Sequence, residues 1–221
     1  TTKMIPLVRL SAVVTLGLDS KVRLVSMRKR YQAIIGPADP KSDMILIEDD
    51  AAVLCSTSDG TLTAYNLRTG EIMYQINLDI TRKLVRVKEK EMILAAIEGG
   101  KIVCVSWPGL NLLTEFIVCD EKEFIVNLVY YSKEDSFVTG TNYGKVRFWK
   151  YQSPFPIIEK SVTTRQGSIM SDFKHLKEWN LLVAIGIMPF VGLYRLDKGG
   201  IEGWFADKLF LTEENMGLFL P

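Results

Sequence analysis

The chain has 221 residues, of which 48% are hydrophobic and 24% are charged, and its formal net charge is +1 at pH 7. Apolar and aromatic residues are frequent enough to exclude a chain that is disordered throughout, and so small a net charge creates no global field toward nucleic acid or an anionic membrane. One histidine and three scattered cysteines are too few soft ligands for a zinc site, so neither a metal nor a cofactor is expected.

From the N-terminus onward, five segments repeat one pattern: an apolar strand, a tight turn of small or polar residues, and a second alternating strand. The first apolar residues after these turns are Val22, Leu62, Ile102, Val146 and Val191. They follow one another at intervals of 40, 40, 44 and 45 residues. A period of this length with a hairpin in each unit is typical of a β-propeller, whereas a helical solenoid would show 3.6-residue patterning.

Each hairpin is expected to gain a strand on either side, which gives the four antiparallel strands of a propeller blade. The preceding strands are predicted over residues 4–10, 44–48, 84–88, 125–131 and 169–174. The clearest following strand is predicted over residues 71–78, where Ile72, Tyr74, Ile76 and Leu78 alternate.

Three of the hairpin turns contain residues that tolerate positive φ, as short hairpin loops require. These pairs are Asp59-Gly60, Gly99-Gly100 and Tyr143-Gly144.

The second and fourth units resemble WD40 repeats. Thr57 and Asp59 stand in the turn positions of that motif, and Tyr65 holds the place of its tryptophan. In the fourth unit, Thr141 and Trp149 hold the corresponding places. The resemblance implies an all-β, WD40-like propeller that acts as a scaffold for other proteins.

The sequence departs from the family pattern, since it contains no Gly-His and no Trp-Asp dipeptide. The tryptophan place is held by Val25, Tyr65, Val105, Trp149 and Tyr194, and the turn aspartate is present only as Asp19 and Asp59. The family's buried hydrogen-bond network is therefore expected to be incomplete in every unit.

A single partial or complete propeller domain of about five and a half blades is predicted over residues 1–221. The blade units are placed near residues 1–38, 39–80, 81–120, 121–163 and 164–207, and a sixth begins at 208–221. We expect these blades to form part of a larger, seven-bladed ring; a closed ring of five or six blades is the alternative.

Contact residues for a protein partner are sought in apolar turns, because loops on rigid β-scaffolds carry binding. Phe190 is the first candidate, followed by Trp107 and Phe155, although the rings at 107 and 155 would also suit packing against their own blades. The basic residues Lys21, Arg23, Arg28, Lys29 and Arg30, with Tyr31 nearby, form a cluster. Its simplest interpretation is an exposed blade face, and its functional interpretations are contact with a protein partner or with phosphate groups.

Reactive chemistry has little support in the sequence. His175 is the sole histidine and is interpreted as a surface loop residue. The acidic pairs Asp49-Asp50 and Glu213-Glu214 are interpreted as solvated turns rather than catalytic or calcium-binding groups. The three cysteines, Cys55, Cys104 and Cys119, are expected to be buried thiols in a reducing compartment.

We therefore expect a non-catalytic scaffold within a larger intracellular complex, most readily in the cytoplasm. No apolar run reaches the roughly 20 residues of a membrane helix, so no membrane insertion is expected. Two alternatives stay open: RNA or phosphate-rich ligands at residues 21–30, and an enzyme or ligand binder that uses a central channel.

Overall fold

The structure is a computed structural model, and it describes residues 2–8, 11–29, 31–47, 51–119, 123–132, 135–143, 145–150, 156–161, 170–176, 181–186, 191–197 and 200–206. By its internal contacts the chain divides into two compact units, residues 1–130 and 131–221.

All strands in the described ranges belong to four-stranded antiparallel sheets, of which there are five. The first three sheets contain β1 (Lys3–Leu7), β2 (Ala12–Leu16), β3 (Lys21–Ser26), β4 (Gln32–Pro37), β5 (Met44–Ile47), β6 (Ala52–Ser56), β7 (Thr61–Asn66), β8 (Ile72–Asn77), β9 (Thr81–Val87), β10 (Met92–Ile97), β11 (Lys101–Ser106) and β12 (Leu112–Ile117). The last two contain β13 (Ile125–Tyr131), β14 (Ser136–Thr141), β15 (Lys145–Lys150), β16 (Pro156–Ser161), β17 (Met170–Leu176), β18 (Leu181–Gly186), β19 (Val191–Asp197) and β20 (Gly200–Ala206). A short 3-10 helix, η3 (Lys88–Lys90), connects β9 and β10.

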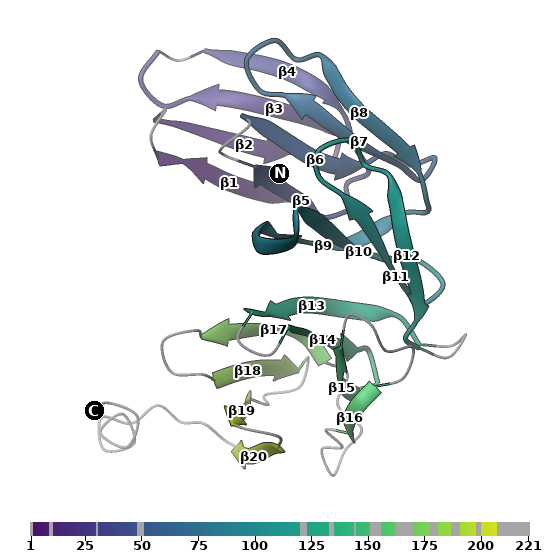
Figure 1. Ribbon diagram of the computed structural model, residues 1–221. Coiled ribbons are helices and arrows are strands. Elements are labelled where there is room, and N and C mark those ends of the chain that lie inside the picture. The colour runs from purple at the N-terminus through teal and green to yellow at the C-terminus, as the bar shows by residue number, and fades with distance from the viewer. Residues whose placement is uncertain are drawn as a thin grey trace, which may run out of the picture. The chain divides into compact units, whose positions relative to one another are not determined.

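Within each sheet the strands lie in chain order, so every sheet is a simple meander (Figure 1). This confirms the prediction of an all-β chain with four antiparallel strands in each repeat. Several boundaries differ from the prediction: β1 ends at Leu7 rather than at residue 10, β9 begins at Thr81, and β17 continues to Leu176.

The hairpin turns confirm the expected backbone conformation where they are described. Gly60 has a φ of 85°, and Gly99 and Gly100 have φ values of 83° and 73°. L-residues with a Cβ rarely adopt this conformation, which explains glycine at these turns. Gly144 lies outside the described residues.

The fourth strand carries a β-bulge at the same place in three sheets. The register shifts between Ala64 and Tyr65, between Cys104 and Val105, and between Phe148 and Trp149. One residue of the outer strand therefore lacks a partner directly opposite: Met73 in β8, Leu113 in β12 and Ile157 in β16. In the first sheet the shift lies elsewhere, between Val22 and Arg23.

The bulge in β8 interrupts the alternation predicted over residues 71–78, so that prediction is only partly right. Tyr74, Ile76 and Leu78 pack against the core as expected. Ile72 is 54% exposed, because the extra residue Met73 moves it off the face that the other three share.

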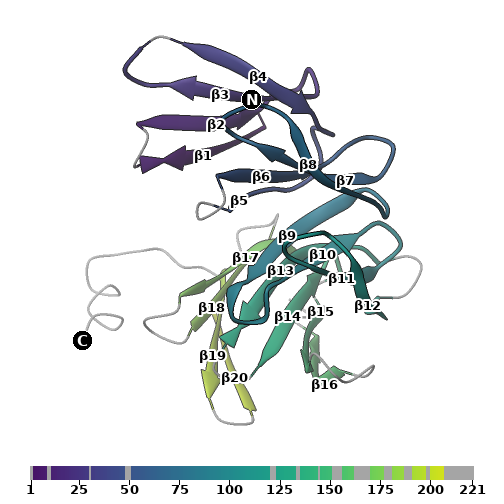
Figure 2. The same cartoon turned by 45° about the horizontal axis from the view of Figure 1, so that its top comes forward.

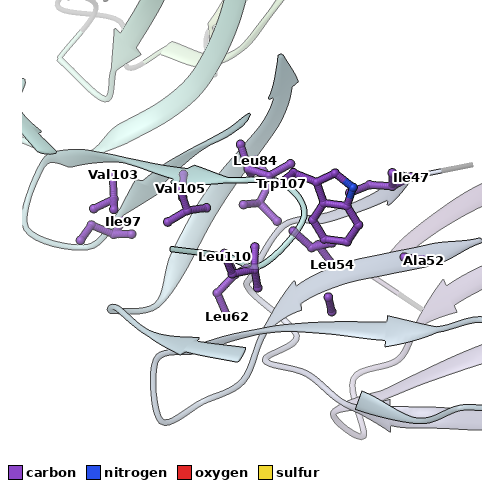
Figure 3. Packing of buried hydrophobic residues seen from close by; sticks show 13 residues of the cluster. Ile47, Ala52, Leu54, Leu62, Leu84, Ile97, Val103, Val105, Trp107 and Leu110 are labelled. Carbon is purple, nitrogen blue, oxygen red and sulfur yellow. The ribbon is translucent and has the colours of Figure 1, made fainter. Parts of the chain in front are cut away.

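Two apolar clusters form the core of the first unit. One joins the first and second sheets and includes Val14, Leu16, Val53, Cys55 and Tyr65. The other joins the second and third sheets and includes Leu54, Leu62, Ile93, Val105 and Trp107 (Figure 3). Burying each large aliphatic side chain stabilises the fold by roughly 1.5–3 kcal/mol, so face-to-face stacking of the sheets is the main source of stability.

Candidate interaction surface on the first sheet

The connection between β3 and β4 forms a fixed, exposed tip at one end of the first sheet. The Ser26 N–H donates to the Tyr31 carbonyl oxygen at 2.8 Å, and the Lys29 N–H donates to the Ser26 hydroxyl oxygen at 3.2 Å. The Met27 N–H donates at 2.9 Å to the carbonyl oxygen of Ser11, in the turn between β1 and β2. Both connections lie at the same end of the sheet (Figure 1 and Figure 2), so backbone hydrogen bonds hold the tip in place.

Apolar and cationic side chains share this end of the sheet, which we call the first-sheet tip and define as Val8, Met27, Arg28, Lys29 and Tyr31. Met27 is 69% exposed and Tyr31 is 59% exposed. Arg28 and Lys29 are also exposed, and neither forms an ion pair with another residue in the described part of the chain.

Four other cations of the first unit have acidic partners. Lys3 pairs with Asp43, Arg23 with Asp19, Arg82 with Glu98, and Lys101 with Glu115 at 3.8 Å. The unpaired charge at the tip is therefore available to a carboxylate or phosphate from another molecule.

The basic cluster predicted over residues 21–30 is split by the strand that carries it. Lys21 and Arg23 lie near the start of β3, whereas Arg28 and Lys29 follow its end. The five steps along β3 from Lys21 to Ser26 alone span about 16 Å at roughly 3.3 Å per residue. Arg23 is also held by Asp19, and this hydrogen bond lowers the pKa of Asp19 to about 2. Arg30 lies outside the described residues.

The WD-like turn residues of the second sheet form a local hydrogen-bond network. The Thr57 hydroxyl donates to the Asp59 carboxylate, and the Thr61 N–H donates to the same oxygen at 3.1 Å. Both hydrogen bonds lower the pKa of Asp59, and the one from Thr57 has the larger effect. In the first sheet, Asp19 contacts Arg23 instead, so the two turn aspartates have different partners.

The residues in the tryptophan place also differ in their partners. The Tyr65 hydroxyl donates to the carbonyl oxygen of Pro37 in β4 at 3.0 Å. The Trp149 indole N–H donates to Oγ1 of Thr139 at 2.9 Å. Thr141, which the sequence pattern singled out, accepts a hydrogen bond from the Lys145 N–H at 3.3 Å. Sequence reasoning missed Thr139, although its place two residues before Thr141 on the same strand face was visible.

Trp107 is buried rather than exposed. It is 2% exposed and lies in the cluster with Ile47, Leu54 and Leu84 (Figure 3). Tyr74 approaches its ring edge-on with centroids 5.7 Å apart, and the Arg86 guanidinium lies 5.5 Å from the ring centroid. This corrects the prediction of Trp107 as a partner contact: the ring packs in the core, against the second sheet as well as its own. Phe155 and Phe190 lie outside the described residues.

The candidate reactive groups are not brought together in the described part of the chain. His175 lies in β17, paired with Leu182, which corrects its interpretation as a loop residue. Cys55, Cys104 and Cys119 are free, buried thiols, as expected. Burial raises the pKa of Cys55 and of Cys104 to about 12, so these thiols are poor nucleophiles near neutral pH.

The described residues contain no group of three or more histidine, cysteine or acidic side chains that could hold a metal ion. The acidic pairs at 49–50 and 213–214 lie outside those residues. No helix within the described ranges is long and apolar enough to cross a membrane.

Comparison with known proteins identifies the fold. No family model and no curated protein matches the sequence. A chain in the crystal structure of the mitotic checkpoint complex has a TM-score of 0.70 and 12% sequence identity, covering 87% of this chain and 62% of that one. The β-propeller domain of Cps50 (Swd1) from Myceliophteria thermophila has a TM-score of 0.71 and 10% identity, covering 89% of this chain and 68% of that one.

The chain therefore has a β-propeller fold, and the resemblance to WD-repeat propellers is confirmed at the level of the fold. It spans less than two thirds of the checkpoint-complex chain that it matches.

Proposed function

We propose that this protein is a non-catalytic scaffold that binds other proteins within a larger intracellular assembly. The observation that carries the proposal is the first-sheet tip: two unpaired cations, Arg28 and Lys29, beside the exposed side chains of Met27 and Tyr31. A rigid backbone that presents aromatic, apolar and basic groups together is typical of protein interfaces.

The fold supports the same proposal. Stacked antiparallel sheets form a stable scaffold, and the buried thiols of Cys55 and Cys104 are poor nucleophiles near neutral pH. One structural neighbour comes from a structure described as a complex. RNA binding is less well supported, because the split of the basic cluster leaves too few adjacent cations for the multiple phosphate contacts on which such binding depends.

A matched pair of charge-reversal variants tests the proposal in the full chain. Arg28→Glu with Lys29→Glu reverses the two basic charges at the tip, and Lys41→Glu with Arg68→Glu reverses two exposed cations elsewhere in the first unit. We expect the amount of protein that co-purifies from native lysate to fall at least tenfold for the tip variant and to stay unchanged for the control.

Two outcomes would contradict the proposal. If the wild-type chain sediments as a free 25.0 kDa polypeptide at low salt with no co-purified protein, it is not a scaffold. If nuclease treatment releases the co-purified proteins as fully as the tip variant does, the tip binds nucleic acid instead.

A further inference from the structure

The first strands of the first three sheets are neighbours, in the order β1, β5 and β9 (Figure 1). Lys3, Asp43 and Lys83 hold the same place in these strands and follow one another at intervals of 40 residues. Lys3 lies opposite Leu16 and Lys83 lies opposite Ala96, near the end of the second strand of each sheet, and Asp43 directly precedes β5. An acidic residue thus stands between two basic ones along the row.

The Asp43 carboxylate joins residues of all three strands. Its Oδ1 accepts hydrogen bonds from the Lys3 ammonium group in β1 and, at 2.9 Å, from the Met44 N–H in β5. Its Oδ2 accepts a hydrogen bond from the Leu84 N–H in β9 at 2.9 Å. The Asp43 N–H donates to the carbonyl oxygen of Thr81, also in β9, at 3.1 Å. One residue therefore links three successive sheets.

The connection that carries Asp43 is held in place by hydrogen bonds of its own. The Asp39 N–H donates to the carbonyl oxygen of Ser56 in β6 at 2.7 Å, and the Lys41 N–H donates to Oδ1 of Asp39 at 2.7 Å. Ser42 is fully buried, and its hydroxyl donates to the Asp39 carbonyl oxygen at 2.8 Å. The Asp43 side chain itself is only 16% exposed. Its carboxylate therefore has little freedom to turn away from its partners.

These hydrogen bonds add direction to the stacking of the sheets. Apolar burial is non-directional, so it favours contact between two sheets without determining how their first strands are aligned. A hydrogen bond to a carboxylate has strict limits of distance and angle, and it is stronger than one between neutral groups. Lys3 and Met44 together hold Oδ1, and this directs Oδ2 toward Leu84.

We infer that Asp43 couples the first sheet to the third. The Lys3 ammonium group orients the Asp43 carboxylate, and the oriented carboxylate holds β9 beside β5. Lys3 is thus a positioning residue for a contact between the second and third sheets, and a disturbance in β1 is transmitted to β9. This coupling goes beyond the proposed scaffold function and does not depend on it.

Amide hydrogen exchange of the Leu84 N–H, measured by NMR in the full chain, tests the coupling. Lys3→Met should raise its exchange rate at least roughly threefold, because a less firmly held acceptor lets β9 separate from β5 more often. Lys3→Arg should keep the rate near that of the wild type, because a guanidinium group can donate to the same oxygen.

Two controls accompany this measurement. Lys41→Met removes an exposed cation from the connection that carries Asp43, so it changes the net charge in the same way without removing a donor to the carboxylate. It should leave the Leu84 rate unchanged. The Leu94 amide reports unfolding of the whole third sheet, because Leu94 is fully buried in β10 between β9 and β11. Its rate should rise much less than that of Leu84 in Lys3→Met.

Asp43→Asn completes a double-mutant cycle with Lys3→Met. An amide group has one acceptor oxygen, so asparagine cannot accept from Lys3 and from Leu84 through two different atoms. Asp43→Asn should therefore raise the exchange rate of Leu84 by itself. In this background Lys3→Met should cause no further change, because the path between the two residues is already broken.

Four outcomes would overturn the inference: an unchanged Leu84 rate in Lys3→Met, an equal rise in Lys41→Met, an equal effect of Lys3→Met with and without Asp43, or equal rises at Leu84 and Leu94. The comparison of Lys3→Met, Lys3→Arg and Lys41→Met decides the matter even if Asp43→Asn does not fold, since all three retain the carboxylate. No partner takes part in these measurements, so a negative result leaves the scaffold function standing.

Discussion

The indole N–H of Trp149 donates a hydrogen bond to Oγ1 of Thr139 at 2.9 Å, and both residues are buried. Thr139 lies opposite Arg147 and Trp149 lies opposite Phe137, so the bond runs diagonally between β14 and β15. The Phe137 ring lies nearly parallel to the indole, with an interplanar angle of 7° and centroids 6.1 Å apart. A polar pair is thereby enclosed by apolar contacts.

Thr139→Val should lower the free energy of unfolding by about 1–3 kcal/mol, because the buried indole N–H loses its acceptor. Removing the donor as well, in Thr139→Val with Trp149→Phe, should cost less than the sum of the two single changes. Urea unfolding of all four proteins in a double-mutant cycle measures the coupling. Strict additivity of the single changes would show that the hydrogen bond contributes nothing to stability.

Gly36→Ala should destabilise the first unit by about 1–3 kcal/mol, since overpacking of a fixed core displaces well-placed side chains. A Cβ at this position would meet Cζ of Tyr65 at 2.5 Å, and the Tyr65 ring is buried and anchored to Pro37. Gly17→Ala is the matched control, because its Cβ would meet the movable ends of Asp19 and Arg23. Thermal melting should show a larger decrease in melting temperature for Gly36→Ala than for Gly17→Ala. Equal decreases in melting temperature would disprove the explanation.

Stability should fall as pH rises above 9, because burial raises the pKa of Cys55 and Cys104 from 9.0 to about 12. As the pH rises, the thiols lose their protons in the unfolded chain before they do so in the folded protein. Their contribution to the free energy of unfolding is therefore complete below pH 9 and is lost progressively up to about pH 12. Each thiol accounts for about 1.4 kcal/mol per pH unit within this window. The free energy of unfolding, measured with urea between pH 8 and 11, should fall less steeply with pH for Cys104→Ala than for the wild type. Identical dependence on pH would refute the prediction.

Asp19 should titrate near pH 2 rather than near 3.8, because the Arg23 side chain donates a hydrogen bond to its carboxylate. The stabilising effect of the pair is present above pH 3.8 and is lost as the pH falls through about 2. Carboxyl carbon chemical shifts followed by NMR would report the midpoint. Arg23→Gln should move it toward 3.8 and leave Asp59, whose pKa is lowered by Thr57, unchanged; a midpoint that stays near 2 would exclude Arg23 as the cause.

The repeat and its hairpins could be predicted from the sequence, because local rules determine them. Gly60 and Gly100 are needed for positive φ, and strict alternation marks the paired strands. The separation of Arg28 from Lys21 was also accessible, since the length of β3 follows from the same alternation.

Features that depend on neighbouring strands could not be predicted in this way. The bulge at Met73 leaves no mark on the alternation of Tyr74 and Ile76, yet it moves Ile72 to the exposed side. Likewise, the burial of Trp107 depends on the second sheet, and the exposure of Met27 depends on what stacks beside it. Such stacking joins residues far apart in the chain, and the single sequence contains no signal for it.

The bulges in the fourth strands have a consequence for solubility. β12 is the terminal strand of its sheet and exposes Leu112, Leu113 and Ile117. A flat apolar strand in such a place is a template for fibril growth, because its free N–H and C=O groups can pair with another chain. The unpaired Leu113 bends β12 and breaks the regular spacing of those groups. We therefore expect the extra residue in each of β8, β12 and β16 to hinder amyloid-like pairing at the outer edges of these sheets.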